Sequence, residues 1–112
     1  MEDPTVKNKI NEIQLIEQRM NNLLQQKQTF QSQLTEVENA TNELEKSNGK
    51  SYKIIGPIMI ESSKEDLKNN LLDKKKILDL RIKTFEKQED KLKEKAKKLQ
   101  QEVMNDMKEQ GN

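Results

Sequence analysis

Two long stretches of the chain carry an apolar residue at every seventh position, the repeat that packs helices together in a coiled coil. In the first stretch the most regular row is Ile16, Leu23, Phe30, Val37 and Leu44. A second row lies three residues earlier and holds Val6, Ile13, Met20 and Leu34, with polar interruptions at Lys27 and Thr41. This pattern predicts one helix over about residues 4–46.

Local signals mark both ends of this first helix. Asp3 is a residue type that favours the N-cap, and Pro4 suits the first helical position, where its missing N–H does no harm. Ser47, Asn48 and Gly49 are typical of a helix C-cap.

The second stretch repeats the pattern over about residues 63–110. Ser62 with Glu65, and Ser63 with Asp66, each have the spacing of a capping box, so a helix is expected to begin near Lys64. One row is Leu71, Leu78, Phe85, Leu92 and Leu99, and the other is Lys75, Ile82, Glu89, Ala96 and Val103.

Two such helices are expected to pair antiparallel, because a stripe of two apolar positions in seven is stable only when a partner covers it. Residues 1–46 carry 5 basic and 8 acidic side chains and residues 64–112 carry 14 and 11, so their net charges of −3 and +3 attract. Pairing by position brings together Phe30 with Phe85 or Ile82, Leu44 with Leu71 or Lys68, and Ile13 with Leu99 or Val103.

The same alignment places Lys27 within about one layer of Glu89, and we predict that the two side chains are neighbours. In the alternative, each side chain reaches water independently.

Composition excludes several classes of function. With 30% hydrophobic and 37% charged residues, a chain of 112 residues cannot fill a compact core, and we expect a single elongated domain. The absence of Cys and His, and carboxylates dispersed on charged helices, argue against an enzyme, and no cofactor or metal is expected. Balanced charge and three aromatic residues argue against nucleic-acid binding. No apolar run approaches a bilayer span, so we expect a soluble, cytoplasmic protein.

The segment between the helices, KSYKIIGPIMIESSKED from Lys50, has a different pattern. Two short runs rich in β-branched residues flank Gly56 and Pro57, which predicts a β-hairpin over about residues 51–61 with a type II′ turn. Its apolar residues would occupy both faces, and its edges would be open. Pairing with hairpins of other subunits in a shared sheet or barrel is favoured over packing against its own helices.

Four features follow one another along the chain: a heptad helix, the hairpin YKIIGPIMI, the capped helix start SSKEDL, and a second heptad helix containing LDLRIKTFEKQEDKL. Together they resemble the β-class subunits of prefoldin, most closely the archaeal ones. The resemblance spans nearly the whole chain. It implies a mainly α fold, a long antiparallel two-helix coiled coil whose central β-hairpin joins an intersubunit β-barrel.

For function, the resemblance implies a chaperone subunit. Members of this family assemble as hexamers of two α-class and four β-class subunits, with the hairpins forming a double β-barrel. The ends of the coiled coils, the tips, capture unfolded proteins without ATP, and the complex passes them to a group II chaperonin. The implied oligomerisation surface here is Tyr52, Ile54, Ile55, Gly56, Pro57, Ile58, Met59 and Ile60.

The two ends of the chain would together form one tip. They carry more apolar side chains than a two-row seam can cover, namely Val6, Ile10, Ile13, Leu15, Val103, Met104 and Met107. Flexible methionines suit a surface that binds many unrelated sequences. Charged residues nearby are candidates for contacting the chaperonin: Glu102, Asp106, Lys108 and Glu109.

A second hypothesis is a structural or adaptor coiled-coil oligomerisation protein, such as a spacer that dimerises and presents its hairpin to a scaffold, which binds no unfolded protein. Truncating both ends of the chain distinguishes the two, because only the chaperone depends on the tips.

Overall fold

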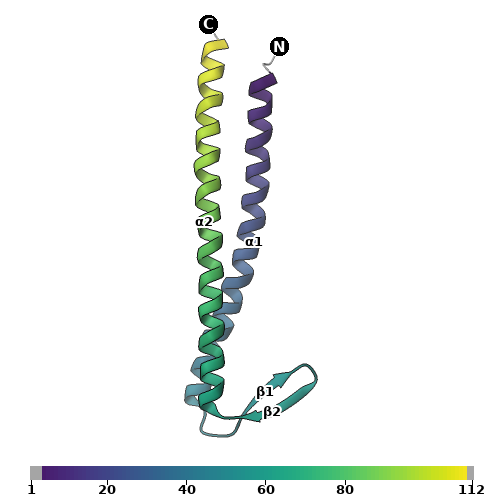
Figure 1. Cartoon of the computed structure of the whole chain (residues 1–112), viewed down its shortest axis with the longest axis vertical. Coiled ribbons are helices and arrows are strands. Elements are labelled where there is room, and N and C mark those ends of the chain that lie inside the picture. Colours follow the sequence, from purple (N-terminus) through teal and green to yellow (C-terminus); the bar gives the residue numbers. More distant parts are fainter. Residues whose placement is uncertain (1–3, 111–112) are drawn as a thin grey trace. The chain divides into compact units, whose positions relative to one another are not determined.

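The computed structural model describes residues 4–110. It contains two long helices, α1 (Pro4–Lys46) and α2 (Lys64–Gln110), joined by an antiparallel pair of strands, β1 (Ser51–Ile55) and β2 (Ile58–Ser62) (Figure 1). The predicted fold class, two long helices with a β-hairpin between them, is confirmed. α1 begins at Pro4 as expected, whereas the proposed N-cap residue Asp3 lies outside the described residues.

The start of α2 is capped by one of the two predicted serines. The backbone N–H of Asp66 donates a hydrogen bond of 3.1 Å to Ser63 Oγ, so Ser63 is the N-cap. Ser62, the alternative, is the last residue of β2. Glu65 and Asp66 in the first turn add negative charge where the helix dipole favours it.

The end of α1 is closed differently from the prediction. Among the glycines that the structure describes, only Gly56 has a positive φ, so Gly49 does not form a left-handed C-cap. Instead Lys64, the first residue of α2, donates hydrogen bonds from Nζ to the carbonyl oxygens of Glu45 and Ser47, at 3.1 and 3.2 Å. A lysine at this position also interacts favourably with the negative end of the helix dipole.

The hairpin has the two-residue turn that the sequence predicts. Ile55 pairs with Ile58 across the turn, and Gly56 has a φ of +56°. Because the ring of Pro57 fixes a negative φ at the next position, this combination matches a type II′ turn.

Replacing Gly56 by Ala is expected to destabilise the hairpin, because a side chain at positive φ costs roughly 1–2 kcal/mol. Backbone amides of β1 and β2 should then exchange with solvent about 5- to 30-fold faster, as measured by hydrogen exchange. Gly49→Ala is the matched control, because Gly49 lacks positive φ and a Cβ there meets no atom within 4 Å. Equal exchange rates in the two variants would contradict this account of the turn.

The chain divides into two compact units, each containing part of both helices. The terminal unit comprises, in its described part, residues 4–27 and 84–110, and the hairpin unit comprises residues 28–83. Within each unit the two helical segments run in opposite directions side by side (Figure 1).

Each unit has only a few buried side chains among its described residues. Buried side chains are Val6, Ile16, Leu99 and Val103 in the terminal unit, and Leu78 and Ile82 in the hairpin unit. The remaining members of the two heptad rows are half-buried, apart from Lys75, which is exposed. Neither described helix has an apolar stretch long enough to cross a membrane.

Candidate assembly and binding surfaces

The hairpin exposes a group of large apolar side chains. Exposed fractions range from 47% to 70% for Tyr52, Ile54, Ile55, Ile58, Met59 and Ile60. The strand register places Ile54 opposite Met59 and Ile55 opposite Ile58, so the two pairs project from opposite faces. Both faces of the hairpin are therefore apolar and open to solvent.

One face of the hairpin looks toward its own helices without packing against them. A groove of about 540 Å³ separates Tyr52 and Ile54 from the helices of the hairpin unit. Leu44 of α1 and Leu71 of α2 both line this groove, which confirms their predicted proximity. Because Tyr52 and Ile54 remain 50% and 70% exposed, the helices leave much of the apolar surface of the hairpin uncovered.

The predicted tip residues, all in the terminal unit, fall into three groups by exposure. Leu15, Met104 and Met107 are 57–58% exposed, and Ile10 and Ile13 are half-buried. Val6 and Val103 are buried, at 4% and 9% exposure, so in this structure they complete the seam between the helices. Their burial agrees with their places in the heptad rows, and the contribution of these two valines to client binding stays a prediction.

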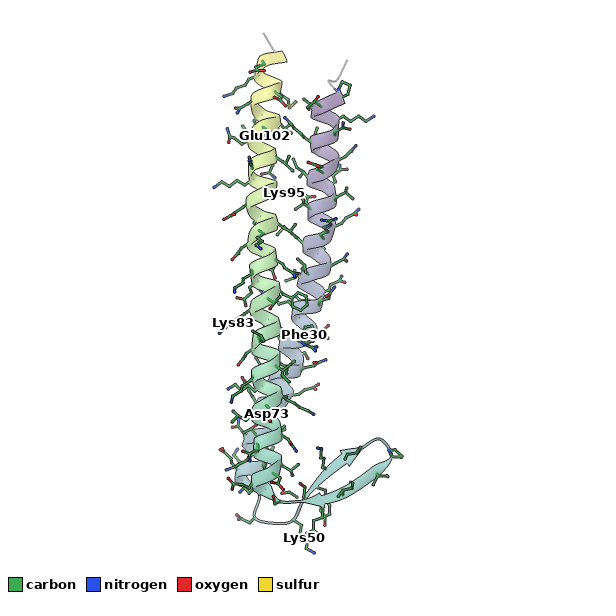
Figure 2. All side chains as sticks on the ribbon, in the orientation of Figure 1. Phe30, Lys50, Asp73, Lys83, Lys95 and Glu102 are labelled. Carbon is green, nitrogen blue, oxygen red and sulfur yellow. The ribbon has the colours of Figure 1, made fainter. Side chains whose placement is uncertain are left out.

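A charged cluster ties the two helices together near their ends. Lys9 Nζ donates a hydrogen bond of 2.7 Å to Asp106 Oδ2 and lies 3.7 Å from Oε2 of Glu102, the residue labelled in Figure 2. The hydrogen bond to Asp106, with the negative charges of Asp106 and Glu102, raises the pKa of Lys9 above 10.5. Charged Lys9 thus favours the folded state below about pH 10.5, and that contribution is lost as pH rises through the raised pKa.

Sequence reasoning did not find this cluster, although the heptad spacing contains it. Lys9 lies seven residues before Ile16, and Asp106 lies seven residues after Leu99. Both therefore continue an apolar row with a charged residue. Of the four residues considered for contacting a chaperonin, Glu102 and Asp106 are engaged by Lys9, whereas Lys108 and Glu109 are exposed.

A second ion pair lies inside the seam of the terminal unit. Lys27 Nζ is 3.4 Å from Glu89 Oε1, which confirms that the two residues are neighbours. Their side chains are only 18% and 13% exposed, and Glu89 Oε1 is enclosed without a hydrogen-bond partner. The charge of Lys27 therefore offsets part of the cost of enclosing this carboxylate.

The hairpin unit uses a different contact at Phe30. The guanidinium of Arg81 lies over the ring of Phe30, 5.3 Å from its centroid. Phe30 is labelled in Figure 2. This cation–π contact covers one side of a half-buried aromatic residue.

No cluster of His, Cys, Asp and Glu suited to holding a metal ion occurs among residues 4–110.

Comparison with known proteins shows similarity over almost the whole chain. A family model described as prefoldin subunit matches residues 7–110. The chain is 33% identical to the prefoldin subunit beta of Archaeoglobus fulgidus over 104 residues, covering 91% of this chain and 90% of that protein. It is 32% identical to the prefoldin subunit beta of Sulfurisphaera tokodaii over 102 residues, covering 89% and 82%.

Among solved structures, the prefoldin beta subunit from Thermococcus strain KS-1 matches with a TM-score of 0.88 at 30% identity, covering 92% of both chains. The resemblance found in the sequence is thus confirmed in sequence and in fold.

Proposed function

Because the chain belongs to the prefoldin subunit family, a family of chaperone subunits and not of enzymes, we propose that it acts as a holdase subunit. In this proposal the ends of its two helices bind unfolded proteins without ATP. The protein works in the cytoplasm, within a hexamer of two α-class and four β-class subunits, and passes its clients to a group II chaperonin.

The exposure of Met104 and Met107 carries this proposal. Both side chains are more than half exposed on α2, beside a seam that Val103 already fills. Unbranched thioether side chains adapt to apolar partners of different shape, which suits a surface that must accept many unfolded sequences. Leu15 of α1 adds a third exposed apolar side chain to the same unit.

A single subunit offers only a small apolar area, so its own affinity for a client would be low. Several subunits that contact one flexible client raise the effective concentration of binding sites, and avidity then provides the strength. Each contact remains easy to break, which is consistent with release without nucleotide.

The hairpin supports the assembly that this avidity requires. Two apolar faces and open strand edges are a common basis for pairing strands between chains. For the contact with the chaperonin, the proposal retains Lys108 and Glu109, because Glu102 and Asp106 already pair with Lys9.

Replacing Met104 and Met107 by Gln tests client binding. Because burying each methionine contributes about 1.5–3 kcal/mol, the complex should need at least about tenfold more protein to suppress aggregation of an unfolded client. Light scattering of a chemically denatured client on dilution measures this, with the assembly state checked by native mass spectrometry.

The matched control is Ile77→Gln with Leu80→Gln, which removes two exposed apolar side chains from the same helix in the hairpin unit. This control should protect clients as well as wild type does. Full protection by an assembled Met104→Gln, Met107→Gln variant would contradict client binding through these methionines, and lack of protection by the assembled wild type would favour the structural or adaptor role.

A further inference from the structure

A groove crosses the seam of the terminal unit on one side. It encloses about 400 Å³ and is lined by Arg19, Asn22 and Leu23 of α1 and by Gln88, Lys91 and Leu92 of α2. Leu23 and Leu92 are half-buried members of the heptad rows and form its apolar floor, while the other four side chains are exposed. This volume lies within the range of about 300–1,000 Å³ typical of ligand pockets.

The rim of this groove carries unbalanced positive charge. No acidic residue lines it, and neither Arg19 nor Lys91 forms a hydrogen bond or ion pair with another described residue. The lysines elsewhere in the terminal seam behave differently, because Lys9 and Lys27 each have a carboxylate partner. Arg19 and Lys91 are therefore available to an external anion.

Two amide side chains complete the rim. Asn22 and Gln88 are exposed, and each presents one carbonyl acceptor and one NH₂ donor. This pairing of donor and acceptor matches the N–H and C=O groups of a polypeptide backbone.

The same chemistry continues along both helices. Leu15, Arg19 and Asn22 are spaced by four and three residues, which places them on one face of α1. Lys91, Lys95 and Lys98 have the same spacing on α2, where Lys95 is labelled in Figure 2. Exposed Leu15 thus lies on the face of α1 that leads into the groove.

We propose that this groove binds segments of unfolded polypeptide in which an apolar residue lies beside acidic residues. The apolar side chain rests on Leu23 and Leu92, and the carboxylates pair with Arg19 and Lys91. The inference rests on the proposed holdase function and specifies a class of client. Charge complementarity selects this occupant, since a wholly apolar segment would desolvate both cations without a partner. A simple anion would leave the leucine floor unused.

Two short fluorescent peptides test the proposal on the full-length chain in its native assembly. Both have the same leucines, flanked by aspartates in one and by lysines in the other. Fluorescence anisotropy should show the acidic peptide binding more tightly. Arg19→Gln with Lys91→Gln should weaken its binding about five- to tenfold, as expected for two partly exposed ion pairs. Raising ionic strength from about 0.1 to 1 M should reduce wild-type binding, because the screening length falls from about 10 to 3 Å.

The control variant is Lys7→Gln with Lys97→Gln, which also removes one charge from each helix of the terminal unit but leaves the groove intact. It should bind the acidic peptide like wild type. An equal loss in both double variants, or displacement of the peptide by the same concentration of inorganic phosphate, would reduce the effect to general charge attraction and overturn the proposal. So would unchanged affinity in the groove variant.

The outcome is separable from that of the client-protection experiment. If the groove proposal fails, Met104→Gln with Met107→Gln still impairs protection of apolar clients. If client binding through the methionines fails, those substitutions leave protection intact, and if the holdase proposal as a whole fails, the assembled wild type does not protect clients, whatever the peptide preference.

Discussion

Replacing Ile58 and Ile60 by Asp will leave the chain folded but prevent it from assembling. Both side chains are already about half exposed in the single chain, at 56% and 47%, so a polar replacement removes little from its own fold. In an assembly that buries them, each isoleucine contributes about 1.5–3 kcal/mol, and each aspartate adds a desolvation penalty. Association should therefore weaken by at least a hundredfold.

Native mass spectrometry, with the proposed α-class partner present and absent, measures this change, and circular dichroism verifies that the helices persist. Ile77→Asp with Leu80→Asp is the matched control, because it places the same charges on exposed apolar positions of α2 outside the hairpin. The control should assemble. Normal assembly of the hairpin variant would show that subunits associate through another surface.

The second large effect is expected inside the terminal seam, at Lys27 and Glu89. Lys27→Leu removes the ammonium that lies 3.4 Å from Glu89 Oε1, an enclosed atom without a hydrogen bond among the described residues. Breaking a buried pair in this way costs about 3–5 kcal/mol. The lower value, about 3 kcal/mol, applies here because both side chains retain some exposure to solvent. The melting temperature should therefore fall by roughly 10 °C.

Replacing both residues by Leu should restore stability, and thermal melting of the variants measures the difference. Substituting an apolar pair for a buried ion pair is neutral or stabilising by about 1–4 kcal/mol. Glu89→Leu alone should cost less than Lys27→Leu, because the long lysine side chain can turn its ammonium toward water. Lys83→Leu, at an exposed position of α2, should change stability by no more than about 0.5 kcal/mol.

Equal melting of wild type and Lys27→Leu would mean that the two charges are solvated independently. If the double variant is stable but pairs its helices in more than one alignment, the ion pair contributes specificity of register and not stability.

The heptad rows allowed most of the fold to be predicted. A two-row apolar stripe is typical of paired helices. The hairpin was predictable because β-branched residues flank Gly56 and Pro57, and this order of residues favours a type II′ turn. The neighbours Lys27 and Glu89 were also predictable, because both interrupt otherwise apolar rows at matching distances from the hairpin. In these cases the information is local or strictly periodic.

The remaining features depend on contacts between distant residues. The cap on α1 comes from Lys64, which no pattern near Ser47 reveals. Lys9 and Asp106 were missed because their rows were ended at the last apolar residue, at Ile16 and at Leu99, and not extended by one more heptad. The groove at Leu23 and Leu92 arises from how neighbouring side chains pack across the seam, which spacing alone does not specify.

The two hydrogen bonds from Lys64 also affect association. They join carbonyl groups at the C-terminal end of α1 to the first residue of α2, and so hold the two ends of the connecting segment close together. A partner would then meet strands that are already aligned, and little conformational freedom remains to be lost on docking. Pre-organisation of this kind would lower the entropy cost of association through the hairpin.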